Sequence, residues 1–222
     1  MHKRFLLNVI LLGLCLGCGT GEYESRIGQR KASSTPDVLG PAEELAGTRV
    51  SIRVPRCMTL LPEGTDPKRS QAIPAPGAQQ RIYEGFVKDS DGGDIPFYCY
   101  FIAMELPKAP GVNLLSQMKS VMEKMPGKPQ FAEVHVTSPE GKESKWDMAH
   151  AADKSEFYYK GKDGKDSLQP MDCVGELYLR EDAGFFVMIA WRVPSNIEKN
   201  VGDIGLAELA KLTAGAVSVK PQ

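Results

Sequence analysis

Histidine and cysteine side chains offer the most direct route to chemistry in this sequence. Beyond residue 18 the chain has two histidines, His135 and His150, and three cysteines, Cys57, Cys99 and Cys173. Imidazole and thiolate together suit zinc or copper, and a cysteine beside a histidine can act as a nucleophile. However, this part of the chain has no CxxC, HxxxH, HExxH or GxSxG spacing. We therefore predict no metal site, no cofactor and no catalytic residue.

The three cysteines leave the question of a disulfide open. At most one intramolecular bridge can form among Cys57, Cys99 and Cys173, and their spacing does not say which two would pair. Free cysteine is among the most buried residue types. We expect the three side chains to be small buried hydrophobic groups.

Acidic turns and three aromatic residues of a polar stretch are two further groups of candidates for ligand contacts. Asp89, Asp91 and Asp94, and separately Asp163 and Asp166, offer oxygen ligands, but neither group has the fixed offsets of an EF-hand. We interpret both groups as turn-forming residues. In the polar stretch 140–166, Trp146, Tyr158 and Tyr159 are typical of sugar-stacking or interface positions. The more economical interpretation is that at least two of these three cover one face of a sheet.

The N-terminal eighteen residues carry a different kind of chemistry. Lys3 and Arg4 precede an apolar run, Phe5 to Leu16, which ends at Gly17-Cys18. The run is too short to span a bilayer as a helix, which takes about 20 apolar residues. Its length is typical of a cleavable export signal.

This segment resembles the bacterial lipoprotein signal, in which a small residue precedes a modified cysteine. Leu16-Gly17-Cys18 matches the end of that lipobox, with Cys15 where the family usually has leucine. The resemblance implies cleavage before Cys18 and lipid attachment there. Several acyl chains anchor a protein stably. A non-lipidated signal peptide and an uncleaved apolar N-terminus are the alternatives.

Composition and charge limit the kinds of partner that the remaining chain could have. The formal charge of −1 becomes about −3 when Lys3 and Arg4 are removed with the signal. The basic residues form no stripe, so we expect no nucleic-acid partner. Residues 1–17 are predicted to be the signal, residues 18–46 a lipidated cysteine and flexible tether, and residues 47–222 one globular domain. Gly19, where many inner-membrane lipoproteins have aspartate, favours the periplasmic face of the outer membrane.

Periodicity predicts the elements that would position these candidates. Alternating or wholly apolar runs predict strands at 48–55, 81–88, 95–106, 131–136, 145–152, 156–160, 172–180 and 184–192. Asn113 is expected to cap a helix from Leu114 to about Met125, whose methionines we assign to the core. Asp203 is expected to cap a final helix that ends at Gly215, with Ile204 on its inner side together with Leu206, Leu209 and Leu212. Residues 62–78 are predicted to be a loop.

Strands 95–106 and 184–192 are apolar on both faces, so layers must cover the sheet on both sides. This predicts an α+β fold, a three-layer α/β/α sandwich with an antiparallel sheet between helices. In element order, residues 47–220 resemble the Mog1/PsbP-like family, whose members are mostly non-catalytic adaptors and assembly factors. That resemblance rests on Ile52-Arg53-Val54-Pro55, the helix at 114–125, the strand meander and the closing helix.

Together these features predict a membrane-anchored envelope lipoprotein that is not an enzyme. Its domain would bind a protein partner of the envelope or assist an assembly. The alternative is an envelope enzyme or metal-binding protein that uses His135, His150 and one of the cysteines.

Overall fold

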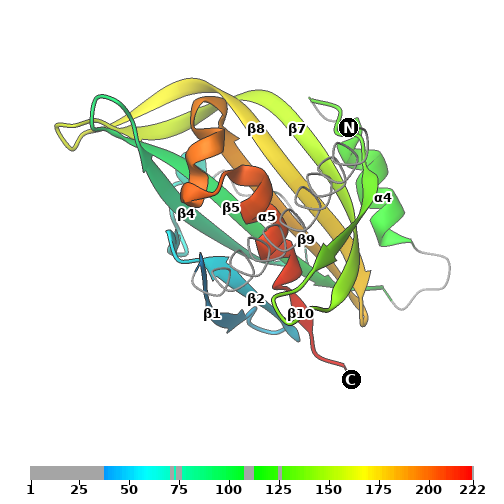
Figure 1. Ribbon diagram of the computed structural model, residues 1–222. Helices are drawn as coiled ribbons and strands as arrows, with labels where there is room; N and C mark the ends of the chain where they lie inside the picture. Colours follow the sequence, from blue (N-terminus) through cyan, green and yellow to red (C-terminus); the bar gives the residue numbers. More distant parts are fainter. Residues whose placement is uncertain (1–37, 71–72, 74–76, 108–112, 125–126, 222) are drawn as a thin grey trace, which may run out of the picture. The chain divides into compact units, whose positions relative to one another are not determined.

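The computed structural model describes residues 38–70, 73, 77–107, 113–124 and 127–221. The predicted signal, Cys18 and residues 19–37 lie outside the described residues. The folded unit begins at Val38. It is an α+β fold in which sheet predominates (Figure 1).

The main sheet has seven strands, and all its neighbouring strands are antiparallel. Their order across the sheet is β3-β4-β5-β9-β8-β7-β6. The strands are β3 (Met58–Leu60), β4 (Gln79–Lys88), β5 (Asp94–Glu105), β6 (Ala132–Thr137), β7 (Glu143–Lys160), β8 (Asp166–Asp182) and β9 (Phe185–Pro194). The two strands predicted to be apolar on both faces, β5 and β9, are neighbours at the centre of this sheet.

Strand β7 is one continuous strand, whereas the sequence predicted separate strands at 145–152 and 156–160. Its polar centre, residues 153–155, pairs with residues 171–173 of β8. The backbone ladder therefore continues through a stretch that lacks any apolar alternation. At its far end Lys160 also pairs with Asp94 of β5.

A second, three-stranded sheet consists of β1 (Leu39–Glu44), β2 (Val50–Pro55) and β10 (Ser218–Val219). Strand β1 lies within residues predicted to belong to the tether, so the folded unit starts at Val38 and not at Gly47. Its ladder with β2 supplies the reason, because it satisfies backbone groups along Ser51 to Pro55.

The described residues also include four helical segments. These are α3 (Pro67–Ser70), α4 (Leu114–Met122), the 3₁₀ segment η1 (Ser195–Asp203) and α5 (Leu206–Gly215). Helix α3 lies within the predicted loop 62–78. Asn113 caps α4 as predicted, since its side chain accepts a hydrogen bond from the Ser116 amide at 2.8 Å. The helix ends at Met122, before the predicted end near residue 125.

The start of α5 differs from its prediction. Asp203 is not the cap, because Gly205 occupies the N-cap position and no side chain caps the helix. Gly202 has φ +58°, a left-handed conformation that, together with the non-helical Val201, breaks the helical geometry inside η1 before α5 begins. Ile204 therefore lies outside the helix and is 39% exposed, whereas Leu206 and Leu209 are buried as expected.

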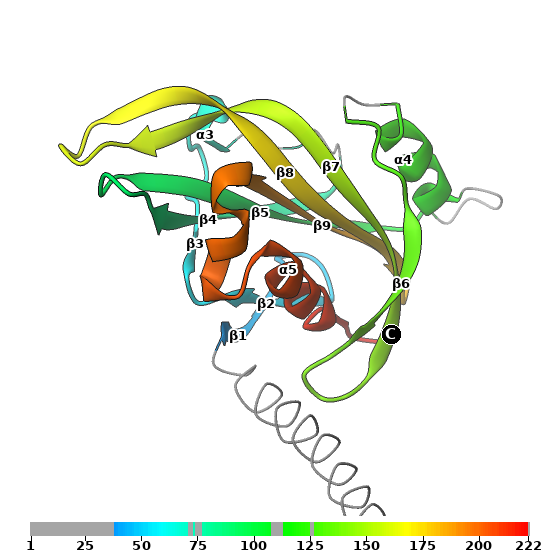
Figure 2. The ribbon, with the colours of Figure 1, turned by 45° about the horizontal axis from the view of Figure 1, so that its top comes forward.

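One face of the main sheet, here named the α5 face, packs against η1, α5 and β2 (Figure 2). A single continuous apolar cluster fills this space. From the central strands it takes Phe97, Cys99, Phe101, Ala103, Val187, Ile189 and Trp191. This is the principal core of the molecule.

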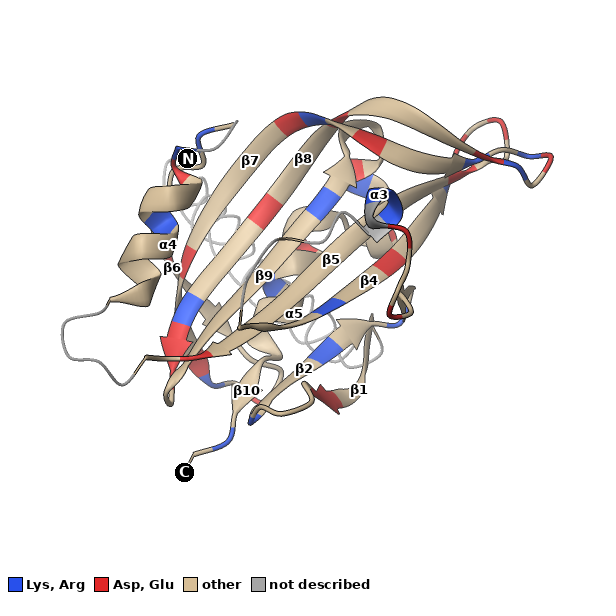
Figure 3. Ribbon diagram, turned by 180° about the vertical axis from the view of Figure 1, so that it is seen from behind, with Lys and Arg blue, Asp and Glu red and all other residues tan. Residues whose placement is uncertain are grey.

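The opposite face, here named the α4 face, is the side of the sheet on which α4 and α3 lie (Figure 3). It has two smaller apolar clusters. Met118, Met122 and other α4 residues cover one of them, which includes Ile102 and Met188. Leu61 and Ile73, from the β3–β4 connection, pack on the other, which includes Tyr98 and Tyr100. Both faces are therefore covered, but α4 accompanies only one of the two clusters on its side.

Candidate functional site

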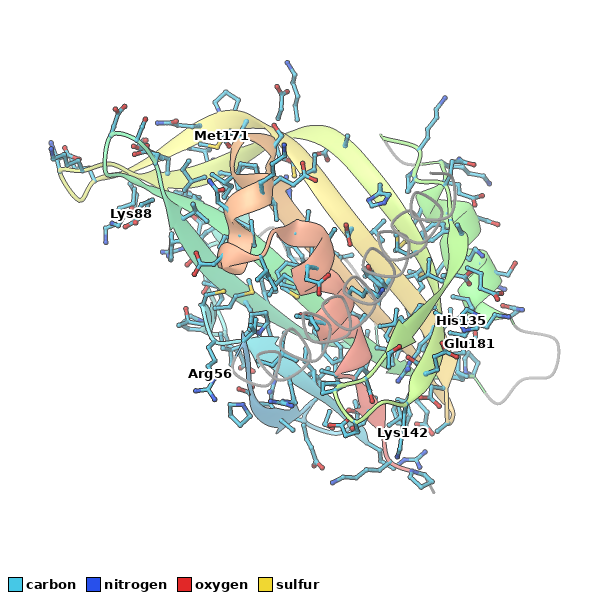
Figure 4. All side chains as sticks on the ribbon, in the orientation of Figure 1. Arg56, Lys88, His135, Lys142, Met171 and Glu181 are labelled. Atoms are coloured by element: carbon cyan, nitrogen blue, oxygen red, sulfur yellow. The ribbon has the colours of Figure 1, made fainter. Side chains whose placement is uncertain are left out.

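The two histidines are not brought together. His135 lies on edge strand β6 and pairs with Lys145 of β7, an odd number of positions from His150, so the two side chains point to opposite faces. His135 is 60% exposed, with ring nitrogens 3.8 Å from Glu133 and 3.7 Å from Glu143 (Figure 4). Such exposed pairs contribute little to stability.

The three cysteines are free thiols and do not share a site. Cys99 packs on the α5 face and Cys173 on the α4 face, as buried side chains. Cys57 is exposed, which corrects the expectation that all three are buried. Burial raises the pKa of the Cys173 thiol to about 11 and also raises that of Cys99. Neither buried thiol is therefore a ready nucleophile at neutral pH.

Among the residues that the structure describes, no group of three or more His, Cys, Asp or Glu side chains is placed to hold a metal ion. The acidic turns are held by local hydrogen bonds. Asp89 accepts hydrogen bonds from the Tyr159 hydroxyl and from the amides of Gly93 and Asp91. The Tyr159 bond is the main cause that lowers the pKa of Asp89. In the second turn, Asp163 accepts a bond from the Lys165 amide.

Two of the three aromatic candidates pack against the main sheet. Trp146 is 1% exposed and Tyr159 is partly buried, and both pack with the α5-face cluster, as predicted for at least two of the three rings. The guanidinium carbon of Arg180 lies 4.5 Å from the centre of the Trp146 ring. Tyr158 donates a hydrogen bond to Asp66, in the β3–β4 connection, at 3.2 Å.

A cavity that sequence reasoning missed lies between β7, β8 and the helical segments η1 and α5. It has a volume of about 360 Å³. Its lining combines small, apolar and acidic residues: Gly127, His150, Ala151, Ala152, Val174, Gly175, Glu176, Glu198 and Leu206. This volume lies in the range of small-molecule pockets.

Glu176 is the buried charge of this cavity, with only 3% of its surface exposed. One carboxylate oxygen, Oε2, accepts a hydrogen bond from the Tyr178 hydroxyl at 3.1 Å. The other, Oε1, lies 3.7 Å from His150 Nδ1, which is beyond hydrogen-bond distance. Desolvation by burial raises the pKa of Glu176, and the nearby Glu198 carboxylate acts in the same direction.

The sequence did carry a signal for Glu176. In strand β8 it alternates with Val174 and Tyr178, which pack with the α5-face cluster, so all three point to the same face. A carboxylate at an inward position of a strand indicates either a paired charge or a binding site.

A second buried acid, Glu84 of β4, has a complete partner. Arg69 of α3 contacts it through two nitrogens, at 3.2 Å and 2.7 Å, in a bidentate ion pair. Glu84 is 3% exposed, like Glu176. This pair fixes α3 to the sheet, and because Glu84 is satisfied there we treat it as structural.

Comparisons with known proteins give structural likeness only. No protein-family model and no curated protein matches the chain. A Bacteroides thetaiotaomicron protein of known structure is 11% identical, with TM-score 0.43; the match covers 78% of this chain but only 46% of that protein.

The Saccharomyces cerevisiae Ran-binding protein Mog1p is 15% identical, with TM-score 0.42 over 82% of this chain and 95% of Mog1p. The PsbP protein of Synechocystis is 10% identical, with TM-score 0.40 over 83% of this chain and 94% of that protein. Scores of this size carry no argument about function.

Proposed function

We propose that this protein is a membrane-anchored lipoprotein of a bacterial envelope and that its folded domain is a non-catalytic binding or assembly module. The observation that carries the proposal is the N-terminal segment, in which Lys3 and Arg4 precede an apolar run that ends at Gly17-Cys18. Cys18 would carry the lipid. Among the described residues, no helix has both the length and the apolar composition needed to cross a membrane.

The start of the folded unit supports a tether. Residues 19–37 separate Cys18 from Val38, where the folded unit begins. These residues include Gly19, Gly21, Ser33, Ser34 and Pro36, a composition typical of linkers. The tether would hold the domain away from the lipid surface, and we place the anchor at the periplasmic face of the outer membrane.

The non-catalytic part of the proposal is supported by how the candidate side chains are arranged. His135 and His150 lie on opposite faces of the sheet, and the two buried thiols lie on different faces as well. The finer fold proposals are a complete three-layer sandwich and membership of the Mog1/PsbP-like family. The α4 side chains on the face opposite α5 support the first of these.

Intact mass spectrometry of the protein from its native membrane fraction tests the anchor. The expected mature chain begins at Cys18 and carries the mass of the attached acyl chains, whereas a Cys18→Ala variant stays unprocessed. A Cys15→Ala variant is the matched control and should be processed and lipidated normally. A mature chain that starts elsewhere and carries no lipid would refute the anchor.

The partner is tested separately, by crosslinking in the native membrane. One envelope protein should be captured by the wild type and by a variant with a different lipidated N-terminus. If the variant with the different lipidated N-terminus no longer captured this envelope protein, the lipidated segment and not the folded domain would bind it. That result would contradict the role of the domain as a binding module.

A further inference from the structure

The Glu176 carboxylate lines the cavity, and the described residues donate a hydrogen bond to only one of its two oxygens. The Tyr178 hydroxyl donates to Oε2, but the described residues donate no hydrogen bond to Oε1. Oε1 is not one of the fully buried side-chain atoms without a partner, so it is accessible from the cavity, where water or a ligand can donate to it. Glu176 is nevertheless almost fully buried and lines the cavity wall, so a donor from a ligand in the cavity would complete its coordination.

The two carboxylates that line the cavity, Glu176 and Glu198, favour a positively charged ligand. Glu198 of η1 also lines the cavity, and its carboxylate acts electrostatically on Glu176. None of the described lining residues is a lysine or an arginine. The remaining ionisable group is His150. Its Nδ1 atom lies 3.7 Å from Glu176, and its side chain is 69% exposed.

The other walls suit short aliphatic carbons. Ala152, Val174 and Leu206 present apolar side chains, whereas Ala151 and Gly175 alternate with them along the strands, so the Ala151 methyl group points to the opposite face of the sheet. A ligand with a charged nitrogen at one end and a few methylene groups behind it would match both the two carboxylates and these walls.

We propose that this cavity binds an alkylammonium group, with Glu176 as the buried counter-ion, Glu198 as a second acidic contact and the alanine, valine and leucine side chains around the alkyl chain. The ammonium group supplies the hydrogen bond that Oε1 lacks. It can come from a small free amine or from a lysine side chain of another protein. The proposal rests on the proposed function only in treating the domain as a binding module, and it holds whether or not Cys18 is lipidated.

Calorimetric titration of the full-length protein in detergent with n-butylamine tests the ammonium group. Saturable binding is expected, and n-butanol, which has the same carbon chain without the charge, should bind at least tenfold more weakly. Equal binding of the alcohol would overturn the proposal, because it would show an apolar cavity that does not select charge. Heat from magnesium or calcium ions with none from the amine would overturn it too.

Variants then locate the site. Glu176→Gln keeps an oxygen for the Tyr178 hydroxyl and should weaken n-butylamine binding at least tenfold. Glu198→Gln should weaken binding only a few-fold, because the Glu198 side chain is exposed. Glu140→Gln, in an exposed turn, is the matched control and should bind like the wild type. Unchanged binding by Glu176→Gln, with the fold verified by circular dichroism, would overturn the assignment.

A second titration, with N-acetyl-lysine methylamide, separates the two sources of the group. Binding of both compounds supports a lysine side chain as a natural occupant. Binding of n-butylamine alone supports a free amine. Failure of both titrations would overturn this inference and leave the lipid anchor, which mass spectrometry tests, unaffected.

Discussion

The two faces of the main sheet are covered in different ways. On the α5 face, helical segments and a second sheet build one continuous cluster around Phe97 and Trp191. On the α4 face, two clusters are covered by α4 and by the β3–β4 connection. The β3–β4 connection is fixed by polar contacts, notably Arg69–Glu84 and Tyr158–Asp66. A strand that is apolar on both sides thus requires two covers, but only one of them needs to be a continuous core.

Alkaline pH is expected to have the largest effect, because it acts on buried tyrosines of both faces. Burial raises the pKa values of Tyr83, on the α5 face, and Tyr100, on the α4 face, to about 12. Burial also raises the pKa values of Tyr98 and Tyr178. In the unfolded chain tyrosine ionises near pH 10. The unfolded state therefore loses protons first, and stability falls as pH rises above about 10.

Between about pH 9 and about pH 11, the loss should total roughly 4 kcal/mol. Urea unfolding at several pH values measures it, and tyrosinate absorbance reports ionisation in the folded state. Full ionisation near pH 10 with the fold intact would contradict the burial of these hydroxyls.

Cavity-forming substitutions compare the two covers directly. Leu209→Ala removes a fully buried side chain of α5 and should cost about 3 kcal/mol or more. Met122→Ala, on α4, should cost about 2 kcal/mol, since Met122 is 7% exposed and its cluster is smaller. Urea unfolding gives both values. An equal or reversed order would show that the α4 face contributes as much as the principal core.

Arg69→Met tests the polar fixation of the β3–β4 connection. The change leaves the buried Glu84 carboxylate without its partner and should cost about 1–2 kcal/mol, a value limited by the 37% exposure of the Arg69 side chain. The double variant Arg69→Met, Glu84→Gln removes the uncompensated charge and should recover much of this loss. A double variant as unstable as the single one would contradict the ion-pair explanation.

The smallest effect is expected from two matched hydroxyl deletions. The Tyr83 hydroxyl donates to Glu43 of β1 at 3.1 Å, so Tyr83→Phe should cost about 1 kcal/mol. The Tyr100 hydroxyl is buried and makes no hydrogen bond of ordinary geometry among the described residues, and the nearby Arg192 guanidinium is its one polar neighbour of note, so Tyr100→Phe should be close to neutral. Thermal unfolding distinguishes the two, and a loss on Tyr100→Phe would reveal a partner for that hydroxyl.

Local patterns predicted the elements whose residues alternate or carry a cap. Alternation found β2, apolar runs found β5 and β9, and Asn113 marked the start of α4. Strand β1 was missed because Leu39-Gly40-Pro41 has no alternation and contains two residues that disfavour strands. Its position depends on distant partners, including a bond from the Arg53 side chain to the Gly40 carbonyl.

The candidate site was harder to predict than the fold. A search by residue type led to histidines and cysteines, which the structure separates. Glu176 became visible only when strand parity placed it inside, and Glu198 comes from η1, which only the tertiary structure brings beside β7 and β8. A site assembled from β7, β8 and η1 requires the tertiary structure.

Strand β2 takes its two partners from opposite ends of the folded unit, with β1 immediately before it and β10 among the last described residues. Ser51 and Ser218, 167 positions apart, share a hydrogen bond across this junction. Closing so long a loop has a large entropic cost, and such high contact order slows folding. We therefore expect the three-stranded sheet to be completed late in folding, because β10 can join β2 only after the whole of the main sheet between them in sequence has been synthesised.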